Sequence, residues 1–404
     1  MSTYFLLVSY IIMPKLGSVD FSVLSLLMCF SVVFLKNIRI KSVPMRCITK
    51  NHIVLYFFMV SLLVLSLVSF IANSGGDIDF QFTLKPIRVV IVSLMLIYIA
   101  KSEKLLIKDV AVIIMLAASI NSTVVVVQYI VQILFGISDF LLNPNFSESV
   151  ITPYRKPGLM SGYPTAGILS ILGILSAIYL YRTEKINKFI FIALFFLNGA
   201  TCFMTARTAV YLFIVVCLPY FMMSVLKRRG LLIIITTALS LASIVTYVAS
   251  SDDKVLSGTV DKMFANIINY SQKGTFNDYS TEDLLENHYE FPNDQFILFF
   301  GNSKSSYDSE TNSDVSIFKI AWNSGILSSI IYVLSYLFIW FSSLSMTKDK
   351  REKVYINIFF CVFFIANAKG FYFFSRVVGD SSMLLWCVAT CRNMLEINEG
   401  GNEK

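Results

Sequence analysis

The chain has 404 residues, of which 56% are hydrophobic and only 15% charged, and its mean hydropathy is +0.70. This composition excludes a water-soluble globular protein, because too few polar residues remain to cover a water-facing surface. Continuous apolar runs are long enough to cross a hydrocarbon core as helices, and they lack the alternation of a transmembrane β-barrel. The net charge of +7 is mainly a topology signal, and nucleic-acid binding is a poor explanation for it.

Hydropathy and helix breakers predict twelve membrane-spanning helices, or eleven if the first is not a span. They cover residues 3–14, 18–36, 52–72, 86–100, 110–136, 164–181, 189–205, 208–226, 231–249, 316–342, 354–373 and 377–391. The first apolar stretch has no basic leader and no small-residue cleavage site, so we expect it to stay in the mature protein. The sequence thus predicts an all-α fold, a polytopic transmembrane helix bundle.

More than half of the Lys and Arg residues fall in short connections that alternate with connections poorer in positive charge. Cytoplasmic loops are enriched in Lys and Arg, so these connections and both termini are predicted to be cytoplasmic. Residues 1–249 then carry nine helices, with a short periplasmic loop at about 137–163. Residues 250–315 form one large periplasmic loop, and residues 316–404 carry three more helices and a cytoplasmic tail.

The large loop is acidic and partly amphipathic. Its apolar residues Val260, Met263, Phe264, Ile267 and Ile268 recur at helical spacing, which predicts a helix lying on the membrane or over a cavity mouth. The loop has no EF-hand spacing, no HExxH motif and none of the seven cysteines. The sequence therefore predicts no metal site, no cofactor and no disulfide framework.

Arg207 is the sharpest exception to the expected charge distribution, because it lies on the side where cations are depleted. Its connection, Thr205 to Ala209, is so short that the guanidinium must stay at the membrane boundary or turn into the bundle. It either anchors a helix end at the lipid head groups or belongs to a site.

Arg155 and Lys156 begin a stretch rich in proline and glycine that ends at Pro164, where the sixth predicted span starts. Broken backbone beside cations suits an anion site, because free amide groups and guanidinium forks both bind phosphate oxygens. The alternative is a plain loop that leads into the helix, with Pro164 in its first turn.

Three further cations lie at predicted outer helix ends. Arg88 and Arg376 each either anchor a helix at the head groups or contribute to a site. Lys369 lies deep enough to need an acidic partner, such as Asp380.

The chain has only two histidines, His52 and His288. His52 begins a predicted span on the cytoplasmic side and is interpreted as an interface residue. His288 lies in the large loop, where it is either an exposed loop residue or a group that exchanges a proton with a substrate near neutral pH.

The layout resembles the O-antigen polymerase, or Wzy-type, family within the O-antigen ligase and polymerase superfamily. The likeness rests on the number of spans, the large outer loop, the stretch Arg155–Pro164 and the turn Ala206–Thr208. The segment Asn312–Val315, leading to Asn323–Leu327, also resembles the point where the large loop returns to the membrane in that family. The resemblance implies a GT-C-like bundle.

The resemblance further implies a glycosyltransferase of the bacterial inner membrane that takes part in lipopolysaccharide biosynthesis. It would polymerise undecaprenyl-diphosphate-linked O-antigen repeat units at the periplasmic face without a metal. Arg155 and Arg207 match the family's periplasmic arginines and would bind the diphosphate leaving group, whose developing charge needs fixed cations. We retain Lys156, Arg88 and Arg376 as further candidate diphosphate ligands.

The resemblance also suggests a base and partners. His288 loosely matches the loop histidine of the related ligases and would activate the acceptor, with Glu286, Glu290 or Asp294 as substitutes. The implied partners are the lipid-linked oligosaccharide, the lipid bilayer and a chain-length regulator protein.

Two alternatives remain open at this stage. An O-antigen ligase uses the same donor and transfers the glycan to lipid A core, so its sequence features are the same. A flippase for the lipid-linked oligosaccharide would show duplicated halves and binding groups at mid-membrane. The chain shows no such repeat, and its unusual charges lie near the predicted outer boundary.

Overall fold

The computed structural model is almost entirely helical and divides into two compact units, which we describe separately. Unit 1 comprises Met1–Ser25 and Ala111–Asp278, and unit 2 comprises Leu26–Val110 and Tyr279–Lys404. The structure describes residues 3–16, 19–39, 48–73, 83–142, 151–225, 254–274, 282, 288–303 and 315–400. The predicted span 231–249 lies outside the described residues.

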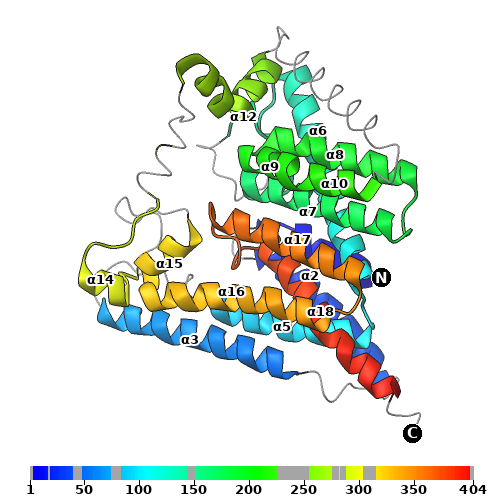
Figure 1. The fold of residues 1–404 in the computed structure, drawn as a ribbon, viewed down its shortest axis with the longest axis vertical. Coiled ribbons are helices and arrows are strands. Elements are labelled where there is room, and N and C mark those ends of the chain that lie inside the picture. The colour runs from blue at the N-terminus through cyan, green and yellow to red at the C-terminus, as the bar shows by residue number, and fades with distance from the viewer. Residues whose placement is uncertain are drawn as a thin grey trace. The chain divides into compact units, whose positions relative to one another are not determined.

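Unit 1 is built around α7 (Tyr163–Arg182), whose residues 166–180 are all buried. Other helices of unit 1 lie alongside α7 (Figure 1), and they approach it closely at its glycines. A Cβ at Gly173 would lie 2.3 Å from the Ala118 Cβ, and one at Gly167 would lie 2.6 Å from the Ala209 Cβ. Small residues at such crossings allow close packing of membrane helices, where no hydrophobic effect drives association.

The other elements of unit 1 are mostly helices. They are α1 (Thr3–Ile12), the two-residue strands β1 (Lys15–Leu16) and β2 (Val19–Asp20), α6 (Ile107–Phe135), α8 (Lys188–Thr205), α9 (Arg207–Leu212), the π-helix η2 (Phe213–Cys217), α10 (Leu218–Val225) and α12 (Lys254–Lys273). The π-helical turn lies directly before Pro219, whose ring would collide with the Val215 carbonyl in a regular α-helix. The widened turn therefore lets one apolar helix continue through a proline.

Unit 2 contains α2 (Phe21–Arg39), α3 (Lys50–Ala72), α5 (Lys85–Ser102), α14 (Gln295–Phe300), α15 (Ser316–Ser324), α16 (Ile326–Met346), α17 (Lys350–Asn367) and α18 (Val378–Gly400). Helix α16 packs against α3, α17 and α18 (Figure 1). Its buried face carries serines, of which Ser328 donates to the Ser324 carbonyl one turn earlier and Ser342 accepts a hydrogen bond from the Trp386 indole. Buried hydroxyl groups thus find partners inside the unit.

The predicted span 316–342 is wrong as one continuous helix, because the structure breaks it at Gly325. Gly325 has φ +83°, and a Cβ there would lie 2.1 Å from the Phe299 carbonyl oxygen. Gly301, at the end of α14, has φ +77°, and its Cβ would lie 2.2 Å from the Asn323 carbonyl oxygen. The two helix ends therefore meet backbone to backbone, which only glycine permits at these positions.

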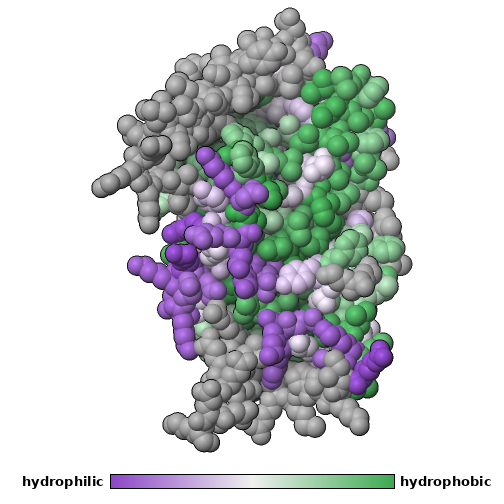
Figure 2. Space-filling model, turned by 90° about the vertical axis from the view of Figure 1, so that its right-hand side faces the viewer, coloured by the Kyte–Doolittle hydropathy of each residue, from purple (hydrophilic) through white to green (hydrophobic). Residues whose placement is uncertain are grey.

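Six described helices are long and apolar enough to cross a membrane: α2, α3, α6, α7, α8 and α16. Shorter apolar helices cover Thr3–Ile12, Arg207–Met223 and Val378–Cys391. Helix α3 presents large apolar side chains outward, with Phe57 and Ile71 each 70% exposed, and Figure 2 shows hydrophobic side chains gathered in broad surface patches. These features support a helical, multi-pass membrane protein. The total of twelve spans and the GT-C-like arrangement stay predictions.

The predicted large loop, residues 250–315, is divided between the two units. Its first part contains α12, which covers the segment predicted to form an amphipathic helix and belongs to unit 1. Its later part, residues 288–303 with α14, belongs to unit 2. Residues predicted to act from this loop must therefore be considered within separate units.

Candidate functional site

The stretch that begins at Arg155 is held against unit 1 by its own backbone. The Lys156 amide donates to the Met204 carbonyl at 2.9 Å, the Gly158 amide to Gln128 Oε1 at 2.9 Å and the Leu159 amide to Asn121 Oδ1 at 2.8 Å. These three amides donate inside the protein, so an anion site in this stretch would have to use its side chains. The bonds of the three amides fix the half-buried Arg155 beside the end of α8.

Lys156 is buried, with only 1% of its surface exposed. Its ammonium donates to Gln132 Oε1 and to the Ser138 carbonyl, both at 3.1 Å. Burial lowers the pKa of Lys156 to about 8, although the nearby charge of Asp139 acts in the opposite direction. This geometry supports an internal role for Lys156 and gives no support to direct contact with a diphosphate.

Arg207 begins α9 and is separated from the end of α8 by Ala206 alone. It is 9% exposed, and its Nη1 donates to Asn266 Oδ1 of α12 at 3.0 Å. The side chain has turned into unit 1 and does not extend into solvent as a plain anchor would. Asn266 is a neutral acceptor, so this hydrogen bond positions the guanidinium without adding a formal negative charge.

Helix α12 is fixed over this region by several contacts. Thr259 lies with its hydroxyl 2.5 Å from the Tyr129 hydroxyl of α6. Gly258 faces Tyr154 so closely that a Cβ would lie 2.4 Å from the ring. The ring of Phe264 lies 6.2 Å from that of Phe203 in α8, between centroids. We call Arg155, Arg207 and Asn266 the Arg207 site.

Unit 2 contains the other predicted site residues. Arg88 of α5 forms an ion pair with Asp380 of α18, with 2.8 Å between Nη2 and Oδ2. The Asp380 side chain is only 3% exposed. The sequence suggested Asp380 as a partner for Lys369, and that assignment is wrong, since the carboxylate pairs with Arg88 and Lys369 lies on the surface. Arg88 thus has a built-in counter-ion.

Arg376 lies half-buried in the connection between α17 and α18. The helix predicted to reach residue 373 ends instead at Asn367, whose Oδ1 accepts from the amides of Tyr372 and Phe373 at 3.2 and 3.1 Å. Val377 adopts φ +71°, a conformation that β-branched residues avoid. Side-chain bonds and packing therefore hold this connection in one shape.

His288 is buried, with 7% of its surface exposed, so it is not the exposed loop residue of the alternative interpretation. Its neighbour Tyr289 donates from its hydroxyl to the Ala368 carbonyl at 2.7 Å and contacts the ring of Phe318. The segment thus lies beside the connection that follows α17, within unit 2.

The proposed substitutes for His288 differ in their environments. Asp294 caps α14 by accepting from the amides of Phe296 and Ile297, at 2.7 and 3.1 Å, which favours a structural role over that of a base. Glu290 is exposed, and Glu286 lies outside the described residues.

His52, interpreted from the sequence as an interface residue, lies inside unit 2. Its side chain is fully buried, with Nε2 3.1 Å from Thr390 Oγ1 and the ring in edge contact with Trp386. Thr49 caps the same helix through His52. The residue therefore joins the start of α3 to α18.

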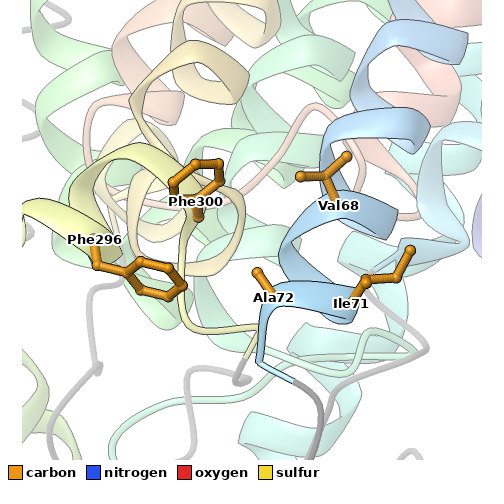
Figure 3. Close-up of a pocket in the computed structure, with 5 residues that line it drawn as sticks. All are labelled: Val68, Ile71, Ala72, Phe296 and Phe300. Atoms are coloured by element: carbon orange, nitrogen blue, oxygen red, sulfur yellow. The ribbon is translucent and has the colours of Figure 1, made fainter.

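An apolar pocket of about 210 Å³ was not predicted from the sequence. Figure 3 shows Val68, Ile71 and Ala72 of α3 on one side, and Phe296 and Phe300 of α14 on the other. Such a lining suits a hydrocarbon chain and provides no group for chemistry. Among the described residues, no group of three or more His, Cys, Asp or Glu is placed to hold a metal ion.

Neither a family model nor a curated protein matches this sequence. The site must therefore be judged from its own geometry. Sequence analysis found Arg155 and Arg207 through the unusual placement of their charge. It missed Asn266, because an asparagine in a polar segment carries no comparable signal.

Proposed function

We propose that this protein polymerises lipid-linked oligosaccharide repeats by glycosyl transfer at a membrane face. In this reaction the bond between the growing glycan and the diphosphate of its polyprenyl carrier breaks. A new bond forms to a hydroxyl group on the next lipid-linked repeat, and the diphosphate leaves on the first carrier. The hydroxyl proton passes to a base.

The observation that carries the proposal is the state of Arg207. A buried arginine at a one-residue helix connection, positioned by a hydrogen bond to Asn266, is suited to stabilising the charge that develops on a diphosphate leaving group. Arg155 lies in the segment that is bonded to the end of α8, and it would add a second cation. Two arginines can bind phosphate oxygens in bidentate fashion, and they remain charged at every physiological pH.

The membrane setting supports the same proposal, because six described helices are suited to spanning a bilayer and the donor is a lipid. The resemblance to O-antigen polymerases supplies the substrate class, a polyprenyl-diphosphate-linked oligosaccharide. Periplasmic placement of the site and cytoplasmic termini follow from the distribution of Lys and Arg and belong to the proposal.

The test is to replace Arg207 by Ala and by Lys in the native host and to display lipopolysaccharide on a gel. We expect Arg207→Ala to reduce polymerisation about 100-fold or more, as removal of a transition-state donor does. Arg207→Lys should retain a small part of the activity, because it keeps the charge without the guanidinium fork.

Arg182 provides a matched control in unit 1, where its guanidinium lies 5.7 Å from the Tyr220 ring centroid. Arg182→Ala should leave the ladder of polymer lengths intact. An unchanged ladder in both Arg207 variants would remove Arg207 from the site. Deletion of the gene separates the polymerase from the ligase, because only loss of a polymerase leaves core capped by single repeats.

A further inference from the structure

Four aromatic side chains of unit 2 gather where the segment before α14 lies against α15. Phe318 and Trp322 are one turn apart on α15, and both are half-buried. The Tyr289 ring lies 5.6 Å from the Phe318 ring in an edge-on arrangement, and the Phe291 ring lies 4.6 Å from it, between centroids. We call Tyr289, Phe291, Phe318 and Trp322 the aromatic platform.

Hydrogen bonds hold the aromatic platform in one shape. The Tyr289 hydroxyl donates to the Ala368 carbonyl at 2.7 Å, and the Trp322 indole donates to the Glu290 carbonyl at 3.0 Å. The segment that carries Tyr289 and Phe291 is therefore tied both to α15 and to the connection after α17. A ligand that meets these rings immobilises little further side-chain freedom, because the rings are already ordered.

The two outer rings of the platform are nevertheless open to their surroundings. Tyr289 is 39% exposed and Phe291 is 41% exposed. Apolar surface left in water forgoes the free energy that its burial provides. Rings that are both fixed and exposed thus form a surface that a partner covers with a gain in free energy.

The polar residues around these rings argue against insertion into the hydrocarbon of a membrane. Glu290 stands between the two outer rings in the sequence and is exposed, as is Asn293. A carboxylate within one residue of each ring makes insertion of either ring into lipid costly. The exposed side chains of the neighbouring α14 differ, because they include Phe296 and Phe299.

We propose that the aromatic platform binds a carbohydrate, with a pyranose ring stacked on the exposed rings of Tyr289 and Phe291. The C–H bonds on the face of a pyranose carry a partial positive charge, which suits the negative face of an aromatic ring. Hydroxyl groups at the edge of the sugar are donors, for which the Glu290 carboxylate and the Asn293 amide oxygen are acceptors. A hydrocarbon chain would use the rings and none of these acceptors.

This inference deepens the proposed function and rests on it for the identity of the glycan. In that reaction the platform holds sugars of a lipid-linked repeat. The platform belongs to unit 2 and shares no residue with the Arg207 site. Its variants therefore test glycan binding separately from the chemistry at Arg207.

The first experiment is saturation-transfer NMR on the detergent-solubilised full-length protein. The probe is the repeat-unit oligosaccharide released from the lipopolysaccharide of the native host. In wild type, saturation of protein signals should pass to the C–H protons of a sugar ring. The double variant Tyr289→Ala/Phe291→Ala should bind the oligosaccharide about tenfold more weakly or worse, because both stacking surfaces are lost.

Controls separate stacking from folding. Phe299→Ala removes a ring of α14 that is 64% exposed and should bind the oligosaccharide as wild type does. Tyr289→Phe removes the hydrogen bond to Ala368 and keeps the ring, so it should retain the affinity. Equal losses of affinity in Tyr289→Phe and in the double variant would show that the contact with Ala368 matters and that stacking does not, which would overturn the proposal.

A membrane arm tests the alternative that lipid covers the rings. Phe291→Trp and Phe299→Trp are placed in nanodiscs of phosphatidylcholine brominated along its acyl chains, which quenches tryptophan fluorescence on contact. The fluorescence added by Phe299→Trp should be quenched and that added by Phe291→Trp should not. Equal quenching in the two variants would assign the platform to the membrane and overturn the proposal.

The outcomes also separate this inference from the proposed function. No transfer to the sugar in wild type, or equal transfer in wild type and the double variant, would overturn the platform even if Arg207→Ala abolished polymerisation. Binding that depends on the two rings would support the platform even if both Arg207 variants left the ladder unchanged.

Discussion

The two units surround one arginine each with different partners. In unit 1, buried Arg207 is bonded to the neutral side chain of Asn266, and nearby Lys156 is bonded to an amide and a carbonyl oxygen. In unit 2, half-buried Arg88 is bonded to the carboxylate of Asp380. A carboxylate both positions a cation and offsets its charge, whereas an amide oxygen positions the cation and carries no formal charge. The comparison therefore assigns Arg88 a role in stabilising the fold, and ligand binding by Arg207 stays a proposal.

The largest expected effect tests the structural role of Arg88. Arg88→Ala leaves the Asp380 carboxylate buried without its counter-ion, which should destabilise the protein by about 3 kcal/mol. Thermal unfolding in detergent measures the change. Lys36→Ala, which breaks the exposed pair between Lys36 and Glu103, is the control and should cost less than about 1 kcal/mol. Equal losses in the two variants would contradict the assignment.

The second prediction concerns a variant in which Arg207 has a carboxylate partner, as Arg88 has in unit 2. Asn266→Asp places a carboxylate at the Arg207 guanidinium, so the charge is cancelled while the contact is kept. We expect polymerisation to fall about tenfold or more, with the melting temperature unchanged or raised. Lipopolysaccharide gels and thermal unfolding measure the two effects.

Asn269→Asp adds the same charge one turn along α12 and serves as the matched control. It should preserve polymerisation. If Asn266→Asp were equally active, the charge of Arg207 would not be what the site uses.

The smallest expected effect concerns Lys156, whose folded-state pKa is about 8 against an ordinary value of 10.5. Between these values the unfolded chain binds more protons than the folded protein, so the free energy of unfolding rises with pH. We expect a gain of about 1 kcal/mol from pH 7 to pH 9, which Lys156→Met should abolish. Melting curves measured from pH 7 to pH 9 test this prediction. If the stabilities of wild type and Lys156→Met changed with pH in parallel, burial would not shift the pKa of Lys156.

The sequence predicted the general class of fold well, because hydropathy and charge distribution depend on composition along the chain. Helices occur at the predicted spans that the structure describes, and α12 covers the predicted amphipathic segment. The break at Gly325 was not predictable, because the need for glycine there arises from the Phe299 carbonyl of another helix. Hydropathy therefore predicts one continuous span for a hydrophobic run that contains a single glycine.

The candidate site was predicted less completely, and for a similar reason. An arginine in a very short connection is visible in the sequence, whereas its partner is not. Asp380 was assigned to nearby Lys369, yet it pairs with Arg88, which is far away along the chain. The contact between His52 and Thr390 was also not predictable, because the two residues are far apart in the sequence. Partners across long sequence separations require the fold.

The meeting of Gly301 and Gly325 has a consequence for ligands of unit 2. Their backbones are in such close contact that a displacement of α14 would also displace α15. Phe296 and Phe300 of α14 form one wall of the apolar pocket, so a hydrocarbon chain that entered the pocket would act on both helices.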